Sequence, residues 1–139
     1  MTRREVVVRD DGDERVYVEW FVGQERQSFT RITTDDGATD EIVMAADVNE
    51  LGQLADALRD AQARLGDSGA ADGTTMVRDL GAVERVYVET DGDYGTLAVE
   101  QVGKLDRMVV FDAEEAGTLA AAVERAKAEL PSVKEGPHV

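Results

Sequence analysis

Two copies of the pattern Arg-x-Tyr-x-Glu contain the side chains whose types and spacing are best suited to chemistry. The segment Glu14–Glu19 recurs without a change as Glu84–Glu89, seventy positions later. A guanidinium group can bind a phosphate, and a tyrosine ring offers a face on which a nucleic-acid base can stack. Alternate residues of a strand point to the same face, so we expect the arginine, tyrosine and glutamate of each copy to lie together. The pattern therefore predicts a surface that binds single-stranded nucleic acid.

The same alternation extends this predicted face beyond the two motifs. Trp20 and two valines alternate with the first motif and form the opposite face, which we expect helices to cover. Phe29 and Arg31 have a spacing that adds them to the motif face, as Arg107 and Phe111 do in the second copy. The predicted nucleic-acid-binding residues are Arg15, Tyr17, Phe21, Phe29, Arg31, Arg85, Tyr87 and Arg107.

A second interpretation of the motif face is purely structural. Tyrosine can pack on tyrosine across strands, and arginine can pair with glutamate, without any ligand. In that case the acidic helices predicted at 47–65 and 112–130 are the surfaces presented to a basic partner. The alternative function is therefore an acidic protein-interaction or structural module.

Other kinds of functional site are not indicated by the residue types. The chain has no cysteine, and its one histidine is His138, so thiol nucleophiles, thiolate metal sites and histidine catalysis are not expected. No glycine-rich phosphate loop occurs, and the acidic clusters at 10–14 and 35–37 lack the spacing of a calcium loop. Turn chemistry accounts for those clusters. We expect a non-enzymatic protein with no catalytic residue, no metal site and no cofactor.

The charge of the chain is strongly acidic. Thirty acidic and fifteen basic residues give a net charge of -15 and a pI near 4.3. Residues 1–69 contain 8 basic and 16 acidic residues and residues 70–139 contain 7 and 14, so both halves share the charge. One explanation is an arginine-rich, high-GC composition with an ordinary acidic surface. The other is adaptation to high salt, where a Debye length of about 3 Å at 1 M screens self-repulsion.

The chain consists of two similar halves. Beyond the motif, residues 49–65 align with residues 114–130 at an offset of 65, and Gly52 aligns with Gly117. Glycine inside a helix costs up to about 1 kcal/mol relative to alanine. Its recurrence at one place predicts a close approach of each helix to its twin or to a sheet; the alternative is that both glycines were inherited from one ancestral copy. The predicted organisation is one domain over 1–139, with repeat one at 4–66, a linker at 67–73, repeat two at 74–131 and a tail at 132–139.

Each half is predicted to contain four strands and one helix. Strands are expected near 5–9, 16–22, 27–34 and 41–46, and in the second half near 75–78, the second motif, 95–102 and 107–111. Asp-Gly pairs at 11–12, 36–37 and 91–92 predict turns. Asp47 and Asp112 each precede a glutamate by three residues, a helix-capping pattern. The sequence predicts an α+β fold of two tandem ββββα repeats packed as an intramolecular pseudo-dimer, with antiparallel sheets that each have one covering helix.

This layout resembles the Whirly, PUR-repeat and positive-cofactor-four group of single-stranded nucleic-acid-binding proteins. Residues 41–58 look like the last strand and the start of the helix in the coactivator members, and residues 109–119 are similar. The resemblance implies a doubled ββββα fold that binds single-stranded DNA or RNA, or a transcription-associated role.

The remaining expectations concern partners and location. The predicted partner is single-stranded nucleic acid or, in the alternative, a basic protein. No apolar run approaches the roughly 18 residues that a membrane span needs, and no apolar signal core follows the N-terminus. We therefore expect a cytoplasmic protein without membrane contact, either a monomeric pseudo-dimer or a higher homo-oligomer.

Overall fold

The structure is a computed structural model that describes residues 2–22, 30–35, 37, 39–45, 47–66 and 72–129. Phe29, the predicted tail and most of the predicted linker lie outside the described residues. The described elements follow one another as four strands, one helix, four strands and one helix. Their bounds are β1 (Thr2–Asp10), β2 (Arg15–Val22), β3 (Thr30–Asp35), β4 (Thr39–Ala45), α1 (Val48–Gly66), β5 (Gly73–Asp79), β6 (Glu84–Asp91), β7 (Tyr94–Gln101), β8 (Lys104–Phe111) and α2 (Ala113–Glu129).

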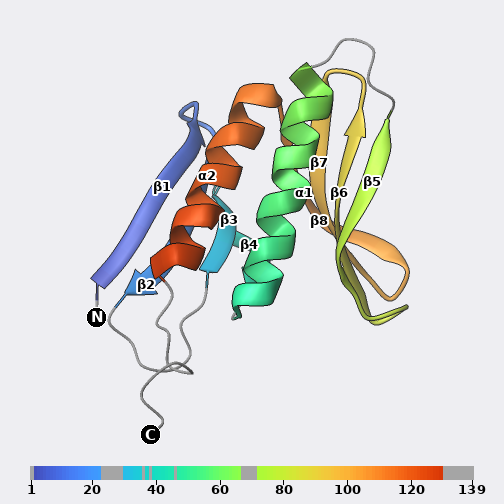
Figure 1. Ribbon diagram of the computed structural model, residues 1–139, viewed down its shortest axis with the longest axis horizontal. Coiled ribbons are helices and arrows are strands. Elements are labelled where there is room, and N and C mark those ends of the chain that lie inside the picture. The colour runs from blue at the N-terminus through green and yellow to red at the C-terminus, as the bar shows by residue number, and fades with distance from the viewer. Residues whose placement is uncertain are drawn as a thin grey trace, which may run out of the picture.

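The strands form two antiparallel sheets of four strands each, ordered β1-β2-β3-β4 and β5-β6-β7-β8 (Figure 1). The predicted mixture of antiparallel sheets and two helices, an α+β class, is confirmed. The glycines of the three predicted Asp-Gly turns have positive φ angles, 94° at Gly12, 109° at Gly37 and 68° at Gly92. Glycine adopts this conformation without steric cost, which is why these pairs end one strand and begin the next.

Both helices begin where the capping pattern predicts. The Asp47 carboxylate accepts a hydrogen bond from the Glu50 backbone N–H at 2.7 Å, and Asp112 accepts one from the Glu115 N–H at 2.8 Å. Glu115 returns the contact by accepting the Asp112 backbone N–H at 2.9 Å. These bonds satisfy donors that the first turn of a helix leaves without partners.

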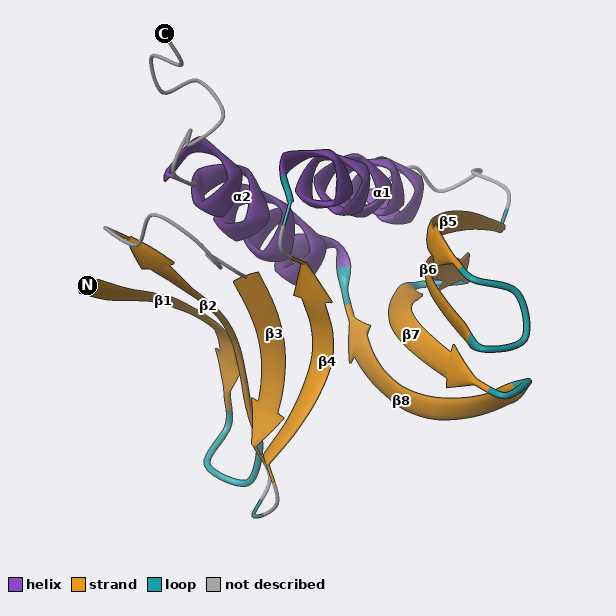
Figure 2. Cartoon of the chain, turned by 90° about the horizontal axis from the view of Figure 1, so that it is seen from below, coloured by secondary structure: helices purple, strands orange, loops and turns teal. Residues whose placement is uncertain are grey.

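Each sheet is covered by the helix from the other half of the chain. Helix α1 contacts β5, β6 and β7, whereas α2 contacts mainly β1 and β2 and, to a lesser extent, β7 and β8 (Figures 1 and 2). The two helices also pack against each other, and β4 of the first sheet contacts β7 and β8 of the second (Figure 2). The sequence predicts one covering helix for each sheet, and the structure adds that the helices are exchanged.

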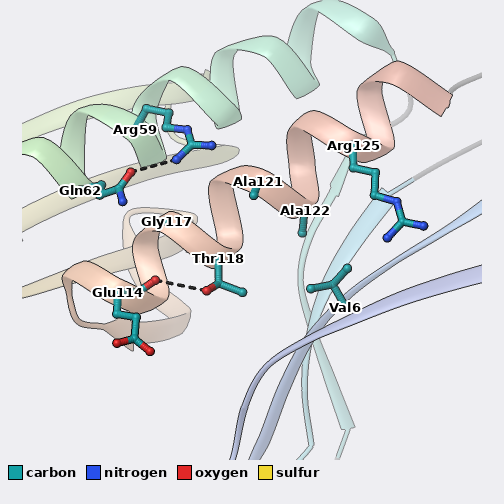
Figure 3. A pocket seen from close by; sticks show the side chains of 9 residues that line it. All are labelled: Val6, Arg59, Gln62, Glu114, Gly117, Thr118, Ala121, Ala122 and Arg125. Atoms are coloured by element: carbon teal, nitrogen blue, oxygen red, sulfur yellow. Dashed lines mark hydrogen bonds between the residues drawn. The ribbon is translucent and has the colours of Figure 1, made fainter.

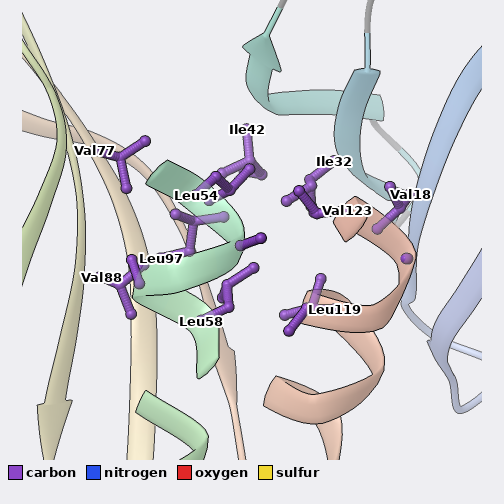
Figure 4. Packing of buried hydrophobic residues seen from close by; sticks show 14 of the residues in the cluster. Val18, Ile32, Ile42, Leu54, Leu58, Val77, Val88, Leu97, Leu119 and Val123 are labelled. Carbon is purple, nitrogen blue, oxygen red and sulfur yellow. The ribbon is translucent and has the colours of Figure 1, made fainter. Parts of the chain in front are cut away.

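A single hydrophobic core joins the two sheets through the helix pair. In Figure 4, Val18 and Ile32 from the first sheet approach Leu119 and Val123 of α2, and Leu97 of the second sheet lies against α1. Trp20 is 2% exposed on this helix-facing side of β2. Among the described residues, no helix is long and apolar enough to cross a membrane.

The two aligned glycines lie where the helices meet. A Cβ atom added to Gly52 would lie 3.2 Å from the Nζ of Lys127, and one added to Gly117 would lie 2.5 Å from the Nε2 of Gln62. The close approach of each helix to its twin, predicted from these glycines, is confirmed.

Candidate interaction surface

The face of each sheet that points away from the helices, here called the outer face, displays the motif residues. In the first sheet, Glu5, Glu19 and Arg31 are direct cross-strand neighbours. Glu19 accepts a hydrogen bond from Arg3 Nε at 2.6 Å and another from Arg31. Arg3 also binds Glu5 at 2.7 Å, and Arg15 binds Glu5. These bonds lower the pKa of Glu5, chiefly through Arg3, so the face is an internally neutralised network.

The aromatic rings on the outer face of the first sheet, Tyr17 and Phe21, lie beneath the same arginines. The guanidinium carbons of Arg15 and Arg3 lie 4.6 Å and 5.8 Å from the centre of the Tyr17 ring, and that of Arg31 lies 6.0 Å from the Phe21 ring. Tyr17 is only 8% exposed. The ring therefore offers little face for base stacking. Arginine–glutamate pairing, half of the structural interpretation, is confirmed here, whereas tyrosine-on-tyrosine packing is wrong because Tyr87 lies in the other sheet.

The second motif has different neighbours. Met76, Tyr87, Ala98 and Met108 form one direct cross-strand row over all four strands of the second sheet. The Tyr87 hydroxyl donates to Glu100 at 2.6 Å, and this bond is the main reason that the pKa of Tyr87 rises to about 12. The row is therefore largely apolar and is exposed at both ends, where Met76 and Met108 lie.

Two charged residues of the first network, Glu5 and Arg31, are replaced by threonines at the equivalent positions of the second sheet. Thr74 stands where the first half has Glu5, and Thr96 lies opposite Glu89 where Arg31 lies opposite Glu19. Glu89 is exposed and accepts a hydrogen bond from the Thr74 hydroxyl at 3.4 Å. Arg85 lies 3.5 Å from Asp79. The outer face of the second sheet is therefore apolar in its middle and acidic beside it.

Exposed apolar side chains are concentrated in the second half. Of nine exposed large hydrophobic side chains among those that the structure describes, eight belong to residues 76–110, and the ninth is Val7. We call these eight residues the apolar surface. They are Met76, Leu80, Val83, Tyr94, Val102, Leu105, Met108 and Val110.

Two turns bring part of the apolar surface together at one end of the second sheet. The Val102 N–H donates to the Val83 carbonyl at 3.4 Å, so the β5–β6 and β7–β8 turns lie side by side (Figure 1). Val102 has a φ of 54° and is 78% exposed. A branched side chain is unfavourable in this left-handed conformation, which costs on the order of 1–3 kcal/mol. The turn thus holds an apolar side chain in solvent at a cost in stability.

One predicted site residue lies on the wrong face, and another cannot be placed. Arg107 is the cross-strand partner of Val99, which is 1% exposed, so it shares the helix-covered face. Phe111, predicted beside it on the motif face, is also 1% exposed and packs in the core. Apolar residues occupy both faces of β8, so alternation alone could not assign them. Phe29 lies outside the described residues, while Arg15, Tyr17, Phe21, Arg31, Arg85 and Tyr87 are on the outer faces as predicted.

A groove of about 500 Å³ runs along α2 beside β1 and the end of α1 (Figure 3). Its floor consists of small residues, Gly117, Ala121 and Ala122. Arg59, Gln62, Thr118 and Arg125 at its edge have partners within the protein. Arg59 binds Gln62 and Glu124, and the Thr118 hydroxyl donates to the Glu114 carbonyl. Most of the polar groups that line the groove are therefore used in contacts within the protein.

Carboxylates of the acidic clusters accept hydrogen bonds from backbone N–H groups in the turns. The Asp11 carboxylate accepts backbone N–H groups of Asp13 at 3.0 Å and Glu14 at 2.8 Å, and these bonds lower its pKa. Asp35 accepts the Gly37 N–H at 3.3 Å. Turn formation, the predicted explanation of these clusters, is confirmed. Within the described ranges, no group of three or more Asp, Glu or His side chains is placed to share a metal ion.

Comparison of the chain with known protein families, curated proteins and solved structures identifies no match. No protein-family model matches the chain, and no curated protein or solved structure matches it. The resemblance to the Whirly, PUR-repeat and positive-cofactor-four group stays a prediction.

Proposed function

We propose that this chain is a non-enzymatic protein-interaction module that binds a protein partner on the outer face of its second sheet. The observation that carries the proposal is that eight of the nine exposed large apolar side chains among the described residues belong to the second half, five on strands of its sheet and three in the turns at one end of it. Single exposed apolar residues are normal on proteins, but a contiguous group marks a binding surface. The strained Val102 adds support, because its side chain is held in solvent at a cost in stability.

Nucleic-acid binding, the first prediction from the sequence, has less support. Phosphate recognition requires cationic side chains that release counterions. Arg3, Arg15 and Arg31 are bound to carboxylates of their own sheet. On the second outer face Arg85 shares the surface with Glu89 and Glu100. With a net charge of -15, the protein repels phosphate at moderate salt.

The experiment is affinity capture from the native lysate with the full chain and two matched variants. Met108→Lys places a cation in the apolar surface, and Val7→Lys places one at the equivalent tyrosine row of the first sheet, where Val7 is 41% exposed. We expect proteins bound by the wild type to be lost with Met108→Lys and kept with Val7→Lys.

The same variants distinguish nucleic acid from protein. Fluorescence anisotropy with labelled oligo-dT and oligo-dA, from 0.1 to 2 M salt, tests nucleic acid directly. An added lysine strengthens phosphate binding, so oligonucleotide binding that increases with Met108→Lys would overturn the proposal and favour nucleic acid. Equal capture of proteins by all three forms would also overturn it.

We further propose that the halves form an intramolecular pseudo-dimer produced by tandem duplication. Equivalent ion pairs connect the edge strands β1 and β5 to the helix of the other half, α2 and α1 respectively. Arg9 binds Glu115 at 3.0 Å, and Arg78 binds Glu50 with Nε at 3.1 Å. Arg9 aligns with Arg78, and Glu50 aligns with Glu115, so the two pairs are related by exchanging the halves.

The helix pair supports the same relation. Gly52 faces Lys127 and Gly117 faces Gln62, and each residue of one pair aligns with a residue of the other. Arg59 binds Glu124 through two hydrogen bonds of 2.9 and 2.6 Å, although these residues occupy the same aligned position. A position that meets its own equivalent lies on a twofold axis. Because this position is arginine in the first half and glutamate in the second, the first half pairs with the second half better than either would pair with a copy of itself.

A further inference from the structure

We propose that the partner bound by the apolar surface is a basic amphipathic segment, with apolar side chains on one side and lysine or arginine beside them. This inference rests on the proposed function. It is carried by the arrangement of apolar and acidic side chains on the outer face of the second sheet.

The middle of the face suits an apolar stripe. The row Met76–Tyr87–Ala98–Met108 crosses four strands, a span of roughly 14 Å at about 4.8 Å between neighbouring strands. An α-helix with its side chains is about 10–12 Å wide, so one helix or an extended strand can cover the row. Methionine side chains adapt their shape to an apolar partner.

Carboxylates lie directly beside that row. Glu89 and Asp91 follow Tyr87 on the same face of β6 and are exposed. Glu100 occupies the same face of β7 and accepts the Tyr87 hydroxyl. In the first sheet the equivalent Glu19 is 5% exposed beneath two arginines of its own sheet. In the second sheet Glu89 is available to cations from outside.

The β5–β6 and β7–β8 turns add further exposed apolar side chains at one end of the second sheet. Leu80, Val83, Val102 and Leu105 are between 55% and 78% exposed, and the Val83–Val102 hydrogen bond holds their turns together. A segment lying across the methionine row can reach this end with further apolar residues.

The carboxylates beside the apolar surface disfavour two other binding partners, a second copy of this chain and a nucleic acid. A second copy of the chain would place Glu89 and Asp91 against carboxylates of the same surface, and both copies would have a net charge of -15. Nucleic acid would bring phosphates to the same carboxylates. A basic segment is attracted by them, and attraction between opposite charges speeds association and weakens with salt.

The probe is a fluorescein-labelled, 14-residue amphipathic peptide of leucine and lysine, with a control in which glutamate replaces each lysine. Anisotropy is measured with the full chain at 0.1 and 0.5 M salt. We expect the lysine peptide to bind with an affinity that falls severalfold at the higher salt, and the glutamate peptide not to bind. Equal binding of both peptides, or of neither, would overturn the inference.

Matched variants locate the binding. We expect Met108→Lys to weaken binding of the lysine peptide about tenfold and Glu89→Gln to weaken it about threefold. Asp13→Asn, which removes one exposed carboxylate at the β1–β2 turn of the first sheet, and Val7→Lys provide the controls. Binding reduced as much by Asp13→Asn as by Glu89→Gln would show attraction to net charge alone and would overturn the inference.

Val102→Asn separates a binding role from a structural one. Asparagine tolerates positive φ better than valine, so we expect this variant to unfold at the same or a higher urea concentration and to bind the lysine peptide severalfold more weakly. Weaker folding with unchanged binding would contradict a role for Val102 in binding.

Failure of the inference and failure of the proposed function give different results. If the lysine peptide does not bind but lysate capture still depends on Met108, the partner class is wrong and the proposed function stands. If capture does not depend on Met108, the proposed function fails.

Discussion

The identical segments Glu14–Glu19 and Glu84–Glu89 occupy the same place in two similar sheets, yet their surroundings differ. Tyr17 and Glu19 are 8% and 5% exposed beneath arginines, while Tyr87 is half-buried and Glu89 is exposed. The difference comes from the neighbouring strands, where the second half has threonines in place of Glu5 and Arg31. A strand motif therefore acquires its role from residues that are distant in sequence.

The largest expected effect concerns Trp20, which aligns with Thr90 in the second half. Trp20 is 2% exposed and donates from its indole N–H to Glu129 at 2.9 Å, whereas Thr90 is 4% exposed. Trp20→Thr makes the first half resemble the second but leaves a cavity. We expect a loss of about 3–5 kcal/mol in the free energy of unfolding, measured by urea denaturation. A loss below about 1 kcal/mol would show that the two positions are interchangeable.

The next effect separates the two motif glutamates. Glu19→Gln leaves Arg3 and Arg31 without their shared carboxylate in a buried place, so we expect a loss of about 2–3 kcal/mol. Glu89→Gln is expected to change stability by less than about 0.5 kcal/mol, because Glu89 is exposed. Both are measured by urea denaturation at neutral pH. Equal losses would contradict the difference between the two outer faces.

A smaller effect tests the equivalence of the halves at Arg59 and Glu124. Arg59→Glu places two carboxylates together, and we expect a loss of about 1 kcal/mol, because both side chains are more than 40% exposed. The double variant Arg59→Glu/Glu124→Arg restores the pair in reverse and is expected to recover most of that loss, except for the Arg59–Gln62 bond. Thermal unfolding at low and high salt measures both. No recovery would argue against a twofold axis at this position.

The smallest effect is a pH dependence that belongs to the second half. Hydrogen bonding to Glu100 raises the pKa of Tyr87 to about 12, above the value of about 10 in an unfolded chain. The unfolded state thus releases this proton first, so stability from this bond is complete below pH 10 and is lost between about pH 10 and 12. Tyr87→Phe removes that loss. Absorbance of tyrosinate at high pH, compared between wild type and variant, provides the measurement, and a Tyr87 titration near pH 10 would contradict it.

Local patterns predicted most of the elements correctly. Asp47 and Asp112 begin their helices because a capping carboxylate acts within one turn, and Gly12, Gly37 and Gly92 lie in turns because φ is set at each residue. The connection between the strands predicted near 95–102 and 107–111 is shorter than expected, because β7 ends at Gln101 and β8 begins at Lys104. Gly103, with a φ of 77°, was the sequence signal for this turn, whereas Val102 beside it has a side chain that is unusual at positive φ.

The candidate site was predicted only in part. Alternation placed Tyr17 and Tyr87 on the outer faces, but it could not reveal that arginines cover one ring and methionines flank the other. Residues on both faces of β8 are apolar, so Arg107 and Phe111 were assigned to the wrong face. The apolar surface itself was missed, although Met76 and Met108 alternate with buried residues in the sequence.

The sequence by itself determined the elements, their order and the similarity of the halves, because caps, turns and alternation act between residues close along the chain. Only the tertiary structure decided that each helix covers the other half's sheet, and that one motif is enclosed while its copy is open. Both outcomes depend on contacts between distant segments, such as Arg9 with Glu115 and Arg31 with Glu19. Identical residues therefore have different surroundings in the two halves.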